Sequence, residues 1–303
     1  FVENIEDLEV TEEALWDSKI ISRTVSQYAK EIEHSAKQLS ELVIVNLFYR
    51  TKTDPQAFGE NMSMHDYANK ILVDNLLDFK NVVFVDIEQL SLSKGIPIVD
   101  DRLRYLHQMP LSNQCCIALA NRYVGAALAY LGMSIRLLLL DLDNTLWGGV
   151  IGEDDIEGID LGGDYPGNCY KDFQRSLKLL SDNGLALGLV SKNNNRDALN
   201  VIKNHPEMIL KIKDFAITKI NWNRKVDNIR AIATEMGLGL ENIGLLDDNP
   251  IERDEVRQYL PQVKVIDLPN EPTELCRFLG NQPYLQSING TTEDKNRVRS
   301  YRQ

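Results

Sequence analysis

The sequence lacks the cysteine patterns of disulfide-rich and zinc-stabilised proteins. Its 303 residues include only four cysteines, and none of them forms a C-x-x-C pair. This set argues against a disulfide framework and against a structural zinc site. Because cysteines remain reduced in the cytoplasm, we expect a cytoplasmic protein.

Long hydrophobic runs are also absent. No apolar stretch reaches the roughly 18 to 20 residues that a membrane-spanning helix needs, and the run at residues 137–140 has the length of a strand. The amino-terminal residues do not follow the pattern of a signal peptide. The sequence therefore predicts no membrane partner.

Positive charge is in short supply. Lys and Arg total 33 against 45 Asp and Glu, a formal net charge of −12. A chain of this sign is repelled by a phosphate backbone, so we expect no nucleic-acid partner. At 43% hydrophobic and 26% charged residues, the composition is that of an ordinary globular chain that can bury a sizeable core.

The most informative segment is an apolar run that breaks into a D-x-D-x-T pattern. Residues 137–140 are all leucine, and Asp141, Asp143 and Thr145 follow. Apolar runs alternate with helical patterns, which predicts an α/β fold with a parallel sheet, and such sheets bind ligands outside the carboxyl ends of their strands. We therefore expect both carboxylates to face a ligand crevice. The alternative is that they are solvated turn residues.

Two further segments supply groups that suit a phosphoryl ligand. A second predicted strand, residues 185–190, leads into Ser191, Lys192 and Asn193, and a hydroxyl at a strand end can hydrogen-bond a phosphoryl oxygen. Lys225 opens a predicted amphipathic helix whose apolar residues recur at helical spacing. Its ammonium would lie near the positive end of that helix, where it can anchor an anion.

A third predicted strand, residues 243–246, ends in the acidic pair Asp247 and Asp248. With Asp141 and Asp143 these carboxylates form an oxygen-rich set that suits Mg²⁺. A carboxylate can attack a phosphate only if a divalent cation and a lysine offset the repulsion between the two anions. The pattern therefore predicts a magnesium-dependent phosphoryl-transfer enzyme.

In this order the four elements resemble the motifs of the haloacid dehalogenase (HAD) superfamily, over roughly residues 135 to 270. The resemblance implies a HAD-like Rossmannoid parallel sheet with a short flap or minimal cap. It also implies that Asp141 is the nucleophile that forms an aspartyl phosphate and that Asp143 is the general acid/base. The remaining roles that it implies are substrate contacts at Thr145, Ser191, Lys192 and Asn193, charge balance at Lys225, and metal binding at Asp141, Asp143, Asp247 and Asp248.

A narrower resemblance lies in longer phrases: DLDNTLWGGVIGEDDIEGIDLGGDYPGNCYKDFQ, LVSKNNNRDALNVI, NWNRKVDNI and GLLDDNPIERDEV. They are similar to the FkbH-like branch of polyketide biosynthesis. Its members dephosphorylate D-1,3-bisphosphoglycerate, hold the glyceryl group as a cysteine thioester, and pass it to the phosphopantetheine thiol of an acyl carrier protein. The resemblance implies that activity and those two partners. The alternatives are a simple magnesium-dependent phosphatase of a small metabolite and a non-catalytic carrier-binding module, which the intact motifs disfavour.

Glyceryl transfer requires a cysteine close to Asp141. Cys169 is the best placed, because it lies in GGDYPGNCY, where this superfamily folds its flap over the site. A predicted helix follows with Asn168 as its N-cap, and the start of a helix favours the reactive thiolate. The alternative is a small apolar residue that packs the flap. The other cysteines are expected to be structural: Cys115 and Cys116 in a core helix, and Cys276 in a helix near the carboxyl end.

We expect a catalytic domain over residues 135–280 and a tail or linker over 281–303. The region 1–134 is expected to be a smaller α/β domain similar to part of the SGNH hydrolase domain that precedes the phosphatase core in FkbH-like proteins. No G-D-S nucleophile precedes its Asp100, Asp101 and His107, so we expect a docking or scaffolding role. Its predicted elements are helices over 21–39, 64–77 and 112–131 and strands over 42–48 and 81–86.

Three other stretches carry expectations of their own. The acidic residues 3–13 are expected to form a surface arm, and the Gly-rich stretch 152–167 a loop that could act as a lid. The basic residues 295–302 are expected to be a solvated tail, with docking of an acidic carrier protein as the alternative.

Overall fold

The computed structural model describes residues 18–39, 41–50 and 63–285. The chain divides into two compact units, residues 1–130 and 131–303. The expected acidic arm (3–13) and basic segment (295–302) lie outside the described residues, as does most of the expected tail. Among the described helices, none has both the length and the apolar character that crossing a membrane requires.

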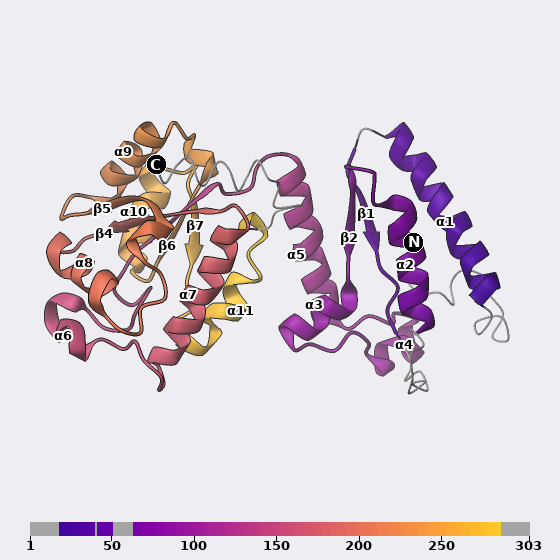
Figure 1. The fold of residues 1–303 in the computed structure, drawn as a ribbon, viewed down its shortest axis with the longest axis horizontal. Coiled ribbons are helices and arrows are strands. Elements are labelled where there is room, and N and C mark those ends of the chain that lie inside the picture. The colour runs from indigo at the N-terminus through magenta and orange to yellow at the C-terminus, as the bar shows by residue number, and fades with distance from the viewer. Residues whose placement is uncertain (1–17, 40, 51–62, 286–303) are drawn as a thin grey trace. The chain divides into compact units, whose positions relative to one another are not determined.

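The first unit is built on a two-stranded parallel sheet with helices on both faces (Figure 1). Strand side chains alternate between the two faces, and each face has its own apolar core. All five elements predicted for this region are present. They are α1 (Ser18–Gln38), β1 (Val43–Asn46), α2 (Met64–Leu76), β2 (Val82–Val85) and α5 (Asn113–Tyr130), joined by two further helices, α3 (Ile87–Lys94) and α4 (Asp101–His107).

The structure tests the predicted burial of the two cysteines in this unit and shows the local role of Asp100. Cys115 of α5 is buried in the core, as predicted, but its neighbour Cys116 is exposed. The prediction for Cys116 was wrong because neighbouring residues of a helix point about 100° apart. Asp100 is the N-cap of α4, and its side chain accepts hydrogen bonds from the amides of Arg102 and Leu103.

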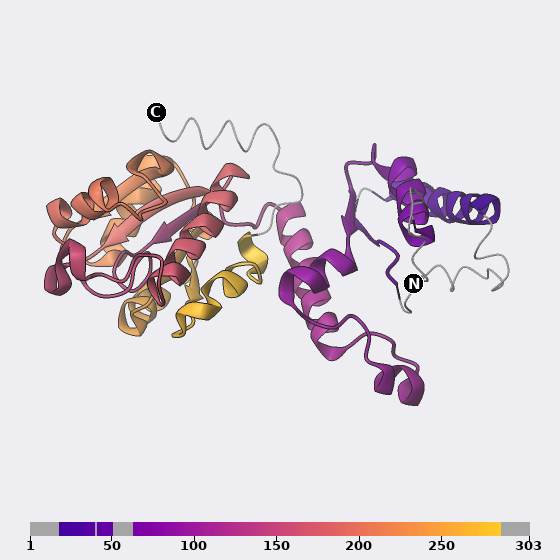
Figure 2. The same cartoon turned by 60° about the horizontal axis from the view of Figure 1, so that its bottom comes forward.

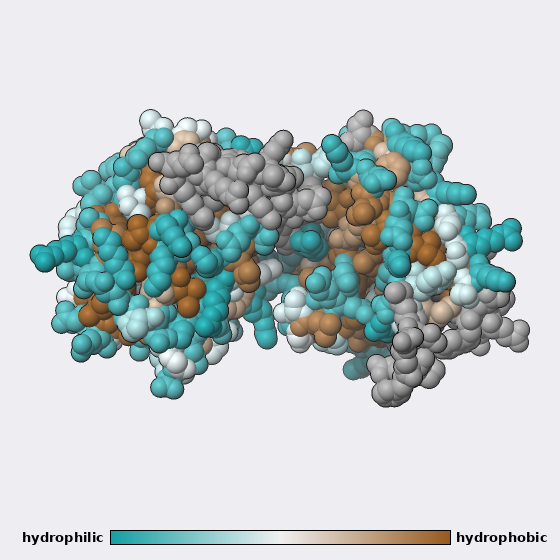
Figure 3. All heavy atoms as spheres, viewed as in Figure 1, coloured by the Kyte–Doolittle hydropathy of each residue, from teal (hydrophilic) through white to brown (hydrophobic). Residues whose placement is uncertain are grey.

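Apolar side chains are exposed on this unit as well. Figure 3 shows brown, hydrophobic spheres between teal ones on the face in view. The large exposed apolar residues of α3, α4 and the turn after α4 are Leu92, Tyr105, Leu106 and Met109. Scattered exposed apolar residues are normal for globular proteins, so this surface does not by itself identify a partner.

The second unit contains a five-stranded parallel sheet with the strand order β5-β4-β3-β6-β7. From the central strand β3 the chain crosses to β4 and β5 on one side and then returns to β6 and β7 on the other. The topological switch point, where such sheets bind ligands, therefore lies between β3 and β6. The strands are β3 (Leu137–Leu140), β4 (Ala186–Ser191), β5 (Phe215–Ile220), β6 (Ile243–Asp247) and β7 (Lys264–Asp267).

Helices cover both faces of this sheet (Figures 1 and 2). The four leucines of β3 are 0% exposed, because alternate side chains point to opposite faces and both faces are covered. This explains why a central parallel strand reads as an unbroken apolar run. One layer contains α7 (Gly167–Asp182), α8 (Asn195–Asn204) and α11 (Leu275–Leu279), and the other contains α9 (Lys225–Met236) and α10 (Pro250–Tyr259).

A short flap lies between β3 and α7. Its base is closed by an antiparallel pair, Gly148 and Asp160, with N···O distances of 3.1 and 2.8 Å. The prediction of a loop over 152–167 was wrong for its first part, because α6 (Ile151–Gly158) occupies it with a bend at Asp155. The carboxylate of Asp154 accepts a hydrogen bond from the amide of Val150 at 2.8 Å. A negative charge in the first turn also stabilises the helix by its interaction with the helix dipole.

Candidate active site

The register of the central strands brings the predicted aspartates together. Leu140 of β3 pairs with Leu246 of β6, so Asp141 and Asp247 follow at the same level, and Asp248 is the next residue. One carboxylate oxygen from each of the three aspartates lies within 4.8 Å of the others. Asp141 and Asp247 are buried, and Asp248 is half-buried. We call these three residues the acidic triad.

Lys225, the first residue of α9, lies against the acidic triad with a side chain that is only 2% exposed. Its Nζ is 2.8 Å from Asp141 Oδ2 and also pairs with Asp247 Oδ2. Burial lowers the pKa of the ammonium, but the charges of Asp141 and Asp247 outweigh this effect, so the pKa is raised overall. Lys225 therefore stays charged and balances one of the three carboxylates.

Burial and the surplus of negative charge raise the pKa values of two aspartates of the acidic triad. Burial raises the pKa of Asp247 to about 6, the charge of Asp141 adds to this, and Lys225 opposes it. Burial and the charge of Asp141 also raise the pKa of Asp248, again against Lys225. Three carboxylates facing one ammonium are short of positive charge.

The acidic triad fits a magnesium ion. Asp141 Oδ1 is buried and has no hydrogen-bond partner among the described residues, and an unsatisfied buried oxygen is costly unless a ligand takes it. The donors are hard carboxylate oxygens, and their charge exceeds that of Lys225 by two units when all are ionised. Such a set suits Mg²⁺ better than a soft metal.

Asp143 is not part of the acidic triad, although the sequence analysis placed it among the metal ligands. Its Oδ1 accepts hydrogen bonds from Trp147 Nε1 at 2.9 Å and from the amide of Ile151 at 3.1 Å. Its Oδ2 accepts from Asn193 Nδ2 at 2.7 Å. The indole, the flap and the loop after β4 thus hold this carboxylate in one orientation, and it is not among the oxygens that lie within 4.8 Å of one another.

The three polar residues predicted to contact substrate from β3 and β4 are largely buried. Ser191, at the end of β4, is 2% exposed and accepts a long hydrogen bond of 3.4 Å from Asn193 Nδ2. Asn193 is 5% exposed and donates its shorter hydrogen bond to Asp143. Thr145 is 0% exposed, and its Oγ1 has no partner among the described residues. The structure thus gives Asn193 a role in orienting Asp143.

The start of α10 supplies two residues that the sequence analysis missed. Glu252 forms an ion pair with Lys192, the fourth predicted substrate contact, and so ties α10 to the loop after β4. Arg253 donates from Nη1 to the carbonyl oxygens of Asp247 and Asp248, both at 2.7 Å. The available signal was their place in the first turn of the helix that follows the acidic pair.

Gln174 of α7 is a further residue that the sequence analysis missed. It is 0% exposed, and its Nε2 donates to the carbonyl of Leu146 at 2.8 Å. Its Oε1 accepts from the amides of Ile209 and Leu210. This side chain ties the segment after Asp143 to the rest of the unit, and the only signal was an amide on the apolar face of an amphipathic helix.

Cys169 lies in the first turn of α7 and is half-buried. The N-cap of α7 is Pro166, so the prediction that Asn168 caps the helix was wrong, and Asn168 Oδ1 instead accepts from Cys169 Sγ at 3.4 Å. Burial raises the pKa of the thiol, and the charges of Asp172 and Glu271 add to this. The expectation of a favoured thiolate was therefore wrong. Neither of these acids belongs to the acidic triad.

Comparison with known proteins gives one informative likeness. No family model matches the chain, and no curated protein does. Among solved structures, the chain is similar to the N-terminal part of the protein BF1531 from Bacteroides fragilis, described as containing a phosphatase domain complexed with Mg. The TM-score is 0.76 at 26% identity, over 94% of this chain and 77% of that chain. Together with the sheet order, this likeness confirms the predicted α/β fold with a HAD-like parallel sheet.

Proposed function

We propose that the chain is a magnesium-dependent phosphatase that transfers a phosphoryl group to Asp141 and then to water. The observation that carries the proposal is the meeting of the acidic triad with buried Lys225 at the switch point of the sheet. The likeness to a phosphatase domain complexed with Mg supports it.

The first step transfers the phosphoryl group. Magnesium, held by Asp141, Asp247 and Asp248, would offset the repulsion between the carboxylate and the phosphate. An oxygen of Asp141 forms a bond to phosphorus while the bond from phosphorus to the ester oxygen breaks. Asp143 gives its proton to that leaving oxygen. Lys225 holds Asp141 Oδ2 and so fixes the direction of the attacking carboxylate.

The second step releases phosphate. Asp143, now a carboxylate, takes a proton from a water molecule as the water oxygen forms a bond to phosphorus. The bond between phosphorus and Asp141 breaks, inorganic phosphate leaves, and Asp143 is again protonated for the next substrate. Splitting hydrolysis into two displacements replaces one difficult step with two easier ones.

Removal of the metal tests this proposal. We expect the chain to release phosphate from p-nitrophenyl phosphate with Mg²⁺, to stop when EDTA is added, and to recover with excess Mg²⁺. Magnesium should also raise the unfolding temperature, since a ligand at 100 times its Kd stabilises the folded state by about 2.7 kcal/mol. Phosphate release that continues unchanged in EDTA would contradict the proposal.

A finer function is proposed on the FkbH-like resemblance. In it the Cys169 thiolate attacks the acyl carbon of D-1,3-bisphosphoglycerate, the bond from that carbon to the phosphate oxygen breaks, and phosphate leaves. Before or after this capture, the two steps at Asp141 hydrolyse the phosphate ester on the third carbon. The carrier-protein thiol then attacks the thioester carbon, the bond from that carbon to Cys169 Sγ breaks, and the proton of the carrier thiol passes to Cys169. The incomplete burial of Cys169 supports it, because a carrier-protein thiol must be able to reach the acyl group. If Cys169 is incidental, the simple phosphatase remains.

Incubation with 1,3-bisphosphoglycerate distinguishes glyceryl transfer from simple phosphatase activity. With Mg²⁺ and freshly generated 1,3-bisphosphoglycerate, glyceryl transfer predicts a glyceryl adduct in the intact-protein mass spectrum that is absent from Cys169→Ala. Cys276→Ala is the matched control, because Cys276 is also half-buried in this unit, and it should keep the adduct. Phosphate release without any adduct would leave the simple phosphatase.

Asn193→Ala should weaken the general acid without removing it. The change deletes the 2.7 Å bond that orients Asp143 Oδ2, while Trp147 and Ile151 still hold Oδ1. General acid catalysis contributes roughly 10² to 10⁴-fold, so we expect kcat for an alkyl phosphate to fall about 10-fold, less than in Asp143→Asn.

The leaving group provides the control for this prediction. p-Nitrophenolate leaves without a proton, so phosphoryl transfer from p-nitrophenyl phosphate to Asp141 should be nearly unchanged in Asn193→Ala, as measured by the pre-steady-state release of nitrophenolate. An equal loss with both esters would mean that Asn193 acts on the whole site and not through Asp143.

A further inference from the structure

The guanidinium of Arg253 lies behind the acidic pair at the end of β6. Nη1 donates to the carbonyl oxygens of Asp247 and Asp248, each at 2.7 Å. Buried backbone carbonyls need a hydrogen-bond partner, and a charged donor gives a stronger bond than a neutral one. The side chain is only 12% exposed. One group thus joins the two successive peptide units that carry two of the three members of the acidic triad.

Asp267 forms an ion pair with Arg253 from the neighbouring strand, although Arg253 Nε donates no hydrogen bond among the described residues. In the register of β6 and β7, Asp267 pairs with Asp247, and its Oδ1 lies 2.9 Å from Arg253 Nε. The same carboxylate binds Arg257 Nη2 at 2.6 Å. Because its side chain is 61% exposed, water and salt screen these ion pairs. The two carbonyl bonds therefore hold the guanidinium more firmly than the exposed ion pair does.

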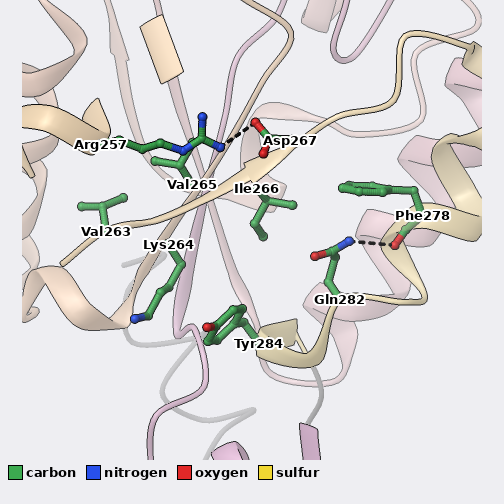
Figure 4. Close-up of a pocket in the computed structure, with 9 residues that line it drawn as sticks. All are labelled: Arg257, Val263, Lys264, Val265, Ile266, Asp267, Phe278, Gln282 and Tyr284. Atoms are coloured by element: carbon green, nitrogen blue, oxygen red, sulfur yellow. Dashed lines mark hydrogen bonds and ion pairs between the residues drawn. The ribbon is translucent and has the colours of Figure 1, made fainter. Parts of the chain in front are cut away.

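Arg257 provides the contrast to Arg253. Arg257 and Asp267 belong to the lining of a hollow of about 410 Å³, as do Lys264 and Tyr284. Figure 4 shows the contact between Arg257 and Asp267. Arg257 pairs with Asp254 and Asp267 and has no bond to the carbonyls of the acidic pair among the interactions of the described residues. The two arginines share one partner, and only Arg253 also binds the acidic pair.

We propose that Arg253 is a positioning residue for the metal: it holds the turn of Asp247 and Asp248 so that both carboxylates point at Asp141. The inference rests on the proposed function, since it assigns magnesium to the acidic triad. The carboxylates repel each other while no cation lies between them, and this repulsion opposes the closed turn. Arg253 resists that opening and so lowers the cost of assembling the site when Mg²⁺ binds.

The test compares magnesium binding to three variants by isothermal titration calorimetry. Arg253→Met removes both carbonyl bonds and should raise the Kd for Mg²⁺ about 10- to 100-fold, the usual loss when a group that orients ligands is removed. Arg253→Lys can reach one carbonyl and should lie between Arg253→Met and the native chain. Arg257→Met, the matched control, should bind Mg²⁺ like the native chain.

Kinetics separate positioning from general damage. At saturating Mg²⁺ the kcat of Arg253→Met should return close to the native value, because the assembled site is the same. An unchanged Kd in folded Arg253→Met, or an equal rise in Arg257→Met, would overturn the inference. If Arg253→Met does not fold, Arg253→Lys decides by the same measurement. A native chain that binds no Mg²⁺ would instead overturn the proposed function.

Discussion

Asp141→Asn should release phosphate on the order of 10⁶-fold more slowly than the native chain, the scale of loss seen when a covalent nucleophile is removed. The amide has almost the shape of the carboxylate, so the change removes the attacking group with little effect on packing. Initial rates with p-nitrophenyl phosphate at saturating Mg²⁺ measure the effect, and acid quenching detects the phosphorylated chain, which should form only in the native protein.

The same change should relieve the rest of the acidic triad. The charge of Asp141 contributes to the raised pKa of both Asp247 and Asp248, so its removal should lower both pKa values. We therefore expect Asp141→Asn to stay folded and at least as stable above pH 6 as the native chain, even though its activity is lost. Asp182→Asn, an exposed aspartate at the end of α7, is the control and should keep full activity. Near-native turnover by Asp141→Asn would contradict the assignment of the nucleophile.

The parts of the site that lie at strand ends were predictable from sequence. Apolar runs identify buried parallel strands, and the carboxyl ends of such strands meet at one edge of a sheet. Asp141 and Asp247 could therefore be placed together although 105 residues separate them, and Lys225 could be placed with them at the start of α9. The structure has each of these residues at the predicted end of its element.

The parts that depend on side-chain direction in loops were not predictable. Asn193 follows β4 in the predicted loop, but only the folded loop shows that its amide turns to Asp143. The charge of Glu271 helps to raise the pKa of the Cys169 thiol, although Glu271 lies about a hundred positions away and no motif links the two residues. Likewise, the position of Arg253 after the acidic pair gives no sign that its side chain folds back onto the carbonyls. Such contacts depend on backbone turns that periodicity does not describe.

Lys225→Met should be strongly destabilising at pH 8. The native ammonium is 2% exposed and pairs with Asp141 and Asp247, so its removal leaves two buried carboxylates without their cation. Loss of one partner from a buried ion pair costs about 3–5 kcal/mol. Urea denaturation without metal measures this loss. Lys219→Met, which breaks the exposed pair with Glu235, is the control and should cost no more than about 1 kcal/mol.

The loss in Lys225→Met should shrink as the pH falls, and this dependence separates an electrostatic cause from a packing defect. In the native fold the pKa of Asp247 is raised from 3.8 to about 6, so its ionisation opposes folding. The penalty is absent below pH 3.8 and grows as the pH rises through 6. Without the ammonium the pKa of Asp247 rises further, so the variant's additional penalty grows only as the pH rises above 6. At pH 5 Asp247 is largely protonated in both proteins, and the missing ammonium therefore costs less. The raised pKa of Lys225 means that its own contribution to stability is complete throughout this pH range and is lost only far above it.

Magnesium should also stabilise Lys225→Met more than it stabilises the native chain, because the cation supplies the charge that the lysine no longer does. A loss that is equal at pH 5 and pH 8 and insensitive to Mg²⁺ would mean that Lys225 acts by filling space and not by balancing the acidic triad.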